Sequence, residues 1–129
     1  MTNKAATKRG MVERIVARAS GFDLIAMSNL HPSTTGVAAV IWVSVGEFEG
    51  KKVQHGPRIK VVPGNKLNPS LLKEAITVTL ENPPRVIGTL SGTLQKQVLG
   101  FVEKNRAVLL QHWNHEIDMK GLLDQLQTV

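Results

Sequence analysis

The stretch "GVAAVIWVSV", residues 36–45, is the part of the sequence that decides the fold. It is rich in valine, isoleucine and tryptophan, which favour strands, and it is far shorter than the roughly 20 apolar residues that cross a bilayer. Successive positions are apolar, so both faces of the strand need cover. We therefore expect this strand to lie in the centre of a sheet, with a helix over at least one of its sides.

Shorter strands are predicted on both sides of this stretch. Residues 22–30 mix apolar and polar positions in near alternation. Residues 58–62, "RIKVV", alternate cation and aliphatic, which predicts Ile59 and Val61 inward with Arg58 and Lys60 outward, in an antiparallel pair with the central strand. Further extended segments are expected over 75–80 and 85–90, on either side of two prolines.

The apolar spacing changes to a helical period at Ser91. It predicts a long helix over 91–116 that covers the sheet, followed by a short helix that begins at the N-cap residue Asp118 and runs through Leu126. Near the N-terminus, Val12, Ile15, Val16 and Ala19 also recur at helical spacing, which predicts a short amphipathic helix over about residues 8 to 19. The predicted class is α+β: a small antiparallel sheet under a long C-terminal helix in one domain over 22–129, with a basic N-terminal helix or arm over 1–21.

Several classes of function are disfavoured by what the sequence lacks. The 129 residues include no cysteine, so no disulfide framework, thiolate metal site or cysteine nucleophile can be proposed. They also contain no glycine-rich phosphate loop, no nucleophile elbow and no paired-carboxylate cluster. No secretory signal or membrane span is recognisable. We expect a soluble cytoplasmic protein that is not an enzyme and uses no cofactor.

The positive charge is unevenly placed along the chain. The net charge is +6, but residues 1–20 hold five Lys or Arg against one Glu, and residues 51–73 hold six against no acid. Two cationic segments on a neutral-to-acidic body favour a polyanion partner, because lysine and arginine release condensed counterions when they meet phosphates. The candidate contact residues are Lys8, Arg9, Arg14, Arg18, Lys51, Lys52, His55, Arg58, Lys60 and Lys66.

Histidines supply the remaining candidates for chemistry. His55 lies three residues before Arg58, and an imidazole that moves a proton beside a phosphate-holding cation would suit a metal-free ribonuclease. In "HWNHE", residues 112–116, two histidines lie one helical turn apart, but no third ligand has metal-site spacing, so we interpret them as polar residues that finish a helix. The aromatic residues fit core positions, so contact with phosphates is favoured over stacking on bases.

The segments "LHPSTTGVAAVIWVSV", "HGPRIKV" and "FVEKNRAVLLQHWNHEIDMKGLLDQL" occur in a familiar order. Together they resemble short bacterial proteins similar to the domain of unknown function 4160 family, in which a helix with an N-R-x-x-L-L-x-x-W pattern ends the fold. Here that pattern is Asn105, Arg106, Leu109, Leu110 and Trp113. The resemblance implies a small α+β domain and accessory or toxin–antitoxin-type cargo of mobile elements, and it brings no catalytic residues.

The favoured function is a non-enzymatic binding module that contacts nucleic acid or a nucleoprotein complex through its basic segments. One alternative is a small regulator or inhibitor, of phage or mobile-element type, whose cations meet an acidic protein surface. Another is a His55-dependent ribonuclease-like toxin. The exposed edges of a small sheet also allow a homodimer.

Overall fold

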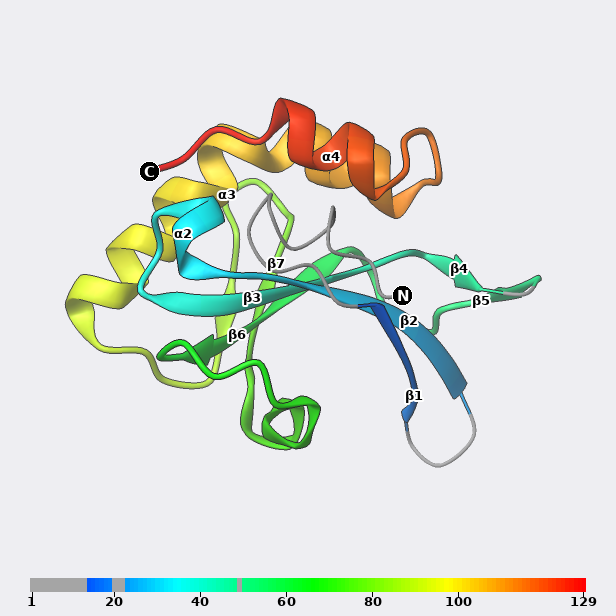
Figure 1. Ribbon diagram of the computed structural model, residues 1–129, viewed down its shortest axis with the longest axis horizontal. Coiled ribbons are helices and arrows are strands. Elements are labelled where there is room, and N and C mark those ends of the chain that lie inside the picture. Colours follow the sequence, from blue (N-terminus) through cyan, green and yellow to red (C-terminus); the bar gives the residue numbers. More distant parts are fainter. Residues whose placement is uncertain (1–13, 20–22, 49) are drawn as a thin grey trace, which may run out of the picture.

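The computed structural model describes residues 14–19, 23–48 and 50–129. Its main sheet has six antiparallel strands in the order β1-β2-β3-β6-β7-β8 (Figure 1). These strands are β1 (Arg14–Ala19), β2 (Asp23–Leu30), β3 (Ala39–Ser44), β6 (Arg58–Pro63), β7 (Ile76–Thr79) and β8 (Val86–Ile87). The other elements are the hairpin strands β4 (Glu47–Phe48) and β5 (Lys51–Lys52), α2 (Pro32–Thr35), the 3-10 helix η1 (Pro69–Glu74), α3 (Gly92–Trp113) and α4 (Met119–Gln125). The predicted α+β class is confirmed.

Strand β3 occupies the centre of the sheet, as its apolar run predicts. It pairs with β2 on one side and β6 on the other, and all six of its residues are buried. Ile41 packs in the main core with residues of α3, whereas Trp42 packs on the other face of the sheet against Leu71 and Leu72 of η1. Both faces are therefore covered, which explains why polar positions are nearly absent from this strand.

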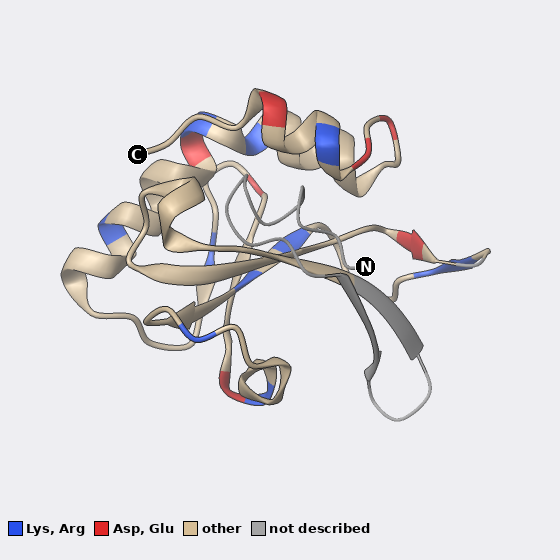
Figure 2. Ribbon diagram, viewed as in Figure 1, with Lys and Arg blue, Asp and Glu red and all other residues tan. Residues whose placement is uncertain are grey.

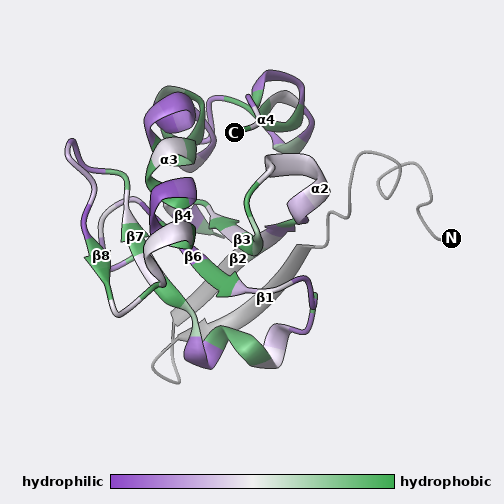
Figure 3. Ribbon diagram, turned by 90° about the vertical axis from the view of Figure 1, so that its left-hand side faces the viewer, coloured by the Kyte–Doolittle hydropathy of each residue, from purple (hydrophilic) through white to green (hydrophobic). Residues whose placement is uncertain are grey.

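Helices α3 and α4 form a layer on one face of the sheet (Figure 3). The hydroxyl of Ser91 accepts a hydrogen bond from the Leu94 N–H (3.3 Å), and the carboxylate of Asp118 accepts one from the Gly121 N–H (2.9 Å). Each helix thus begins with a side-chain cap, and the predicted cap at Asp118 is confirmed. The buried positions of α3 follow the predicted apolar stripe, with Phe101 at its centre.

The prediction of a helix over about 8 to 19 is wrong for residues 14–19. These residues form β1, which pairs antiparallel with β2 from Arg14 opposite Ser28 to Ala19 opposite Asp23. The adjacent β-branched residues Ile15 and Val16 fit both periodicities, and pairing with β2 gives the backbone a full ladder of hydrogen bonds. The sheet therefore continues across the predicted boundary at residues 21 and 22. Lys8 and Arg9 lie outside the described residues.

The last residues of the chain return along α3, where two side chains hold them: the Lys104 Nζ donates to the Thr128 carbonyl at 3.1 Å, and Asn105 bonds to Gln127. Asn105 Nδ2 donates to the carbonyl oxygens of Phe101 (3.0 Å) and Gln127 (2.9 Å), while its Oδ1 accepts from the Gln127 N–H (2.8 Å). The Val129 N–H then donates to the carbonyl of Thr35 (3.0 Å). Asn105 therefore acts as a clip that joins the C-terminal tail to the helix.

Candidate functional site

Four of the cations predicted from the sequence lie on β5 and β6, whereas Arg14 and Arg18 lie on β1 at the far edge of the sheet. Lys51 and Lys52 are exposed on β5, and Arg58 and Lys60 are half-buried on β6. We call these four residues the cationic strip; Figure 2 shows them in blue on the two strands. Lys66 is exposed in the loop beyond the opposite end of β6, so the length of that strand separates it from the other cations.

The strand that carries Arg58 and Lys60 is not an edge strand of the sheet. It lies between β3 and β7, where the register places Lys60 between Trp42 and Thr77. The Lys60 Nζ donates a hydrogen bond to the Thr77 hydroxyl at 2.7 Å. Ile59 and Val61 point into the main core, so the two cations face away from α3, as the alternation predicts.

Lys60 is held in a position that disfavours its own charge. Burial, and after it the positive charge of Arg58, lowers the pKa of the Lys60 ammonium. Neither cation forms an ion pair within the described part of the chain, where Arg85, Arg106 and Lys120 are the cations that pair with nearby acids. An anion beside Lys60 and Arg58 would relieve their mutual repulsion, so this face of β6 is suited to accept one.

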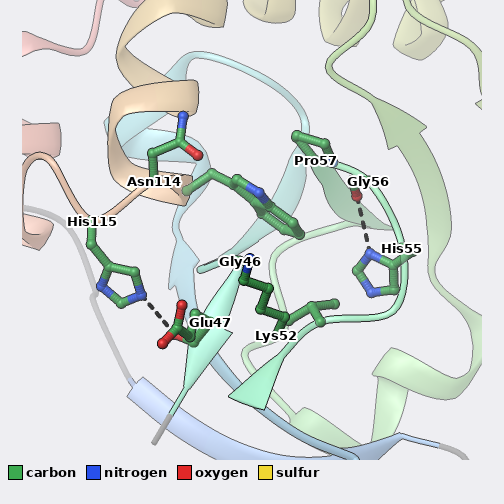
Figure 4. Close-up of a pocket in the computed structure, with 10 residues that line it drawn as sticks. Gly46, Glu47, Lys52, His55, Gly56, Pro57, Asn114 and His115 are labelled. Carbon is green, nitrogen blue, oxygen red and sulfur yellow. Dashed lines mark hydrogen bonds between the residues drawn. The ribbon is translucent and has the colours of Figure 1, made fainter. Parts of the chain in front are cut away.

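A pocket lies next to the strip, where β6 begins. Its volume is about 320 Å³, and its lining comes from β4, β5, the loop into β6 and the residues that end α3 (Figure 4). Lys52 belongs to both the strip and this lining. We call the cavity the His55 pocket, because His55 forms one of its walls.

His55 is fixed by a backbone carbonyl and an aromatic ring. Its Nδ1 lies 3.0 Å from the carbonyl oxygen of Gly56, and its ring centroid lies 5.9 Å from that of Trp113, with 43° between the ring planes. A carbonyl oxygen only accepts, so Nδ1 carries a hydrogen and Nε2 is the acceptor of the neutral ring. The Arg58 Nε donates to the same carbonyl oxygen at 3.4 Å. The pocket and the cationic strip therefore meet at Gly56.

His115 forms part of the rim opposite His55. It follows the end of α3 in the left-handed backbone region, with φ of 62°, and its Nε2 lies 2.6 Å from the carbonyl oxygen of Glu47. His112, one turn earlier, is buried instead. The two histidines that the sequence groups together thus have different surroundings. Within the described chain, no group of three His, Cys, Asp or Glu residues is placed to hold a metal ion.

The sequence contains only a weak signal that the residues at the end of α3 form one wall of this pocket. Trp113 is a core residue, as predicted, yet its indole also faces the cavity together with Asn114 and His115. Gly46 has no side chain, so its backbone can approach Trp113 closely. Its N–H donates to the carbonyl of Trp113 at 2.8 Å. A glycine between a buried strand and a short hairpin is the one local hint, and it does not reveal which distant residue packs there.

No family model, curated protein or solved structure matches this chain. The site must therefore be interpreted from its own geometry. None of the described helices combines the length and the apolar character that are needed to span a membrane.

Gly46→Ala is expected to lower the free energy of unfolding by about 1–3 kcal/mol, as overpacked positions do. A Cβ at this position would lie 2.5 Å from Trp113 Nε1 and 2.8 Å from its Cε2, so the indole would have to move. Denaturant unfolding followed by tryptophan fluorescence measures the loss.

Gly56→Ala is the matched control. Gly56 lines the same pocket, but a Cβ there meets no atom within 4 Å and the backbone is not left-handed. Its effect should stay within about 0.5 kcal/mol. Equal stability of the two variants would contradict the close packing of Gly46 against Trp113.

Proposed function

We propose that the protein is a non-enzymatic module that binds nucleic acid through the phosphates, using the cationic strip. The observation that supports this proposal most directly is the pair Arg58 and Lys60 on one face of β6, with no acidic partner in the described chain. Residues two apart in a strand lie about 7 Å from each other, which approaches the spacing of successive phosphates in a nucleic-acid strand. Lys51 and Lys52 add positive charge on the β4–β5 hairpin.

The placement of the acids favours the strip over the other cations of the molecule. Arg85 pairs with Glu81 at 2.9 Å, Lys120 with Asp124 at 2.9 Å, and Arg106 with Glu103 at 3.6 Å. These exposed or partly exposed pairs contribute little to stability, but they neutralise the surface around them. Glu47 lies opposite Lys52 in the β4–β5 register, but Arg58 and Lys60 form no ion pair within the described chain, so β6 is the part of the strip best suited to a polyanion.

The test is a titration of nuclease-treated protein with short labelled DNA and RNA, single-stranded and duplex, at 50 and 200 mM salt. Four phosphate contacts predict that affinity falls by about 50- to 150-fold over this range, because each contact releases counterions. Arg58→Gln with Lys60→Gln should weaken binding at low salt and roughly halve the salt slope, since two of the four cations are removed.

Lys96→Gln with Lys120→Gln is the control, because it removes the same two charges from the exposed surface of α3 and α4. It should change the affinity and the slope much less than the strip variant. Absence of binding at 50 mM salt, or equal losses in the two double variants, would reject the proposal. A saturable complex with an acidic protein that survives nuclease digestion would support the regulator alternative instead.

A further inference from the structure

The His55 pocket adjoins the end of the cationic strip formed by Lys52 and Arg58, whereas Lys60 lies farther along β6 on the face that points away from α3. Lys52 belongs to both, and the Gly56 carbonyl receives His55 Nδ1 at 3.0 Å and Arg58 Nε at 3.4 Å. A polynucleotide whose phosphates lie on the strip would therefore carry at least one nucleotide past the mouth of the pocket. The chemistry of the side chains that line the pocket indicates which ligand it can hold.

The walls combine flat rings with polar groups. His55 and Trp113 present two aromatic rings tilted by 43°. The exposed residues Glu47, Asn114 and His115 supply a carboxylate, an amide and an imidazole around the same cavity (Figure 4). Few aliphatic side chains line it, so an aliphatic chain would find little apolar surface. A planar ligand with hydrogen-bonding edges fits these walls better, and a nucleobase has both properties.

The size of the pocket limits what can enter. Its volume of about 320 Å³ is near the lower end of the range of about 300–1,000 Å³ found for small-molecule sites. This space admits a single base and excludes a base pair. A base in a duplex would first have to unpair and unstack, which costs free energy that a base in a single strand does not have to supply.

We propose that the His55 pocket receives one unpaired base of a single-stranded nucleic acid whose phosphates lie on the cationic strip. This inference rests on the proposed function and adds to it a preference for single strands. It also revises the expectation from the sequence that no aromatic surface is available for stacking: the two rings come from segments that only the folded chain brings together.

The experiment compares two labelled single-stranded oligonucleotides of equal length and equal phosphate number, one with all its bases and one abasic throughout its central segment. Fluorescence anisotropy at fixed salt gives the two affinities. Stacking of one base on an aromatic ring predicts that the protein binds the complete oligonucleotide about 5- to 150-fold more tightly than the abasic one. A duplex with the same number of phosphates should show no such gain from base stacking, because its bases are already paired and stacked.

His55→Ala and His55→Phe connect this preference to the pocket. Alanine removes the aromatic wall, so the ratio of the two affinities should fall toward one. Phenylalanine restores a flat ring of similar size. The logarithm of the affinity ratio should therefore recover to at least half of its value in the unmodified protein. Circular dichroism and thermal unfolding establish that both variants are folded, which His55 permits because it is only partly buried and lies in a loop.

The outcomes separate the two proposals. Equal binding of both oligonucleotides, with a steep salt slope retained, would overturn the base pocket and leave the phosphate-binding function standing. A preference that persists unchanged in His55→Ala would also overturn it, because the base would then bind elsewhere. Failure to bind either oligonucleotide would reject the proposed function, and the base pocket with it.

Discussion

Replacing Phe101 with alanine is expected to lower the free energy of unfolding by about 3–5 kcal/mol. The ring is completely buried in the middle of α3 and packs in the main core with β3, β6 and β7. Truncation removes its buried area and leaves a cavity that the central strand cannot close without breaking its pairing on both sides. Urea or guanidinium unfolding, monitored by circular dichroism, measures the change in midpoint and slope.

Lys96→Ala on the same helix is the control for Phe101→Ala. Lys96 is exposed, and alanine is a better helix former, so this change should stay within about 0.5 kcal/mol. A small domain has only about 5–15 kcal/mol of total stability, so the Phe101 variant should lose a large part of it. A loss below 1 kcal/mol would contradict the packing of α3 on the sheet.

Asn105→Ala is expected to cost about 2–4 kcal/mol, because it removes three hydrogen bonds of about 1 kcal/mol each and leaves a small cavity. The bonds are those from Asn105 to Phe101 O, to Gln127 O and from the Gln127 N–H. The C-terminal tail should also detach. Hydrogen exchange at the amide of Val129, which is bonded to Thr35, reports that release.

Asn29→Ala provides an unusually close control for Asn105→Ala. Asn29 is 0% exposed and Asn105 is 1% exposed, so the two substitutions remove the same buried group. Neither side-chain polar atom of Asn29, however, has a hydrogen-bond partner within the described structure. Its removal eliminates an unsatisfied buried amide and should cost less than about 1 kcal/mol. Similar losses at both positions would show that the bonds to Gln127 do not hold the tail.

The central strand and the long helix could be predicted because the spacing of their apolar residues along the chain indicates which positions are buried. A run of β-branched residues over 39–44 leaves few alternatives to a central strand, and the apolar stripe of α3 repeats at the period of a helix. The N-R-x-x-L-L-x-x-W pattern has structural roles in the same way. Asn105 clips the tail, the Arg106 Nε donates to the carbonyl of Leu80 at 3.2 Å, and Leu109 and Trp113 are buried.

The features that the sequence misses depend on contacts between distant segments. Residues 14–19 become a strand because β2 offers an edge, and nothing within those six residues separates that outcome from a short helix. The alternation in β6 predicts which side chains point outward. It does not show that β7 pairs with the edge of β6 that β3 leaves open. The pocket is missed for the same reason, since its walls come from residues 46–47, 52–57 and 113–115.

The two tryptophans lie on opposite sides of the sheet. Trp42 is enclosed with the residues that pack under η1, while Trp113 borders the pocket beside His55. The chain has no tyrosine, so its near-ultraviolet emission comes almost entirely from these two indoles. The protein thus contains its own optical probes: Trp113 senses an occupant of the pocket, and Trp42, which lies opposite Lys60 in the register, is next to the proposed phosphate contacts. Ligands can be followed on the unlabelled chain, without attaching a dye that would alter its charge.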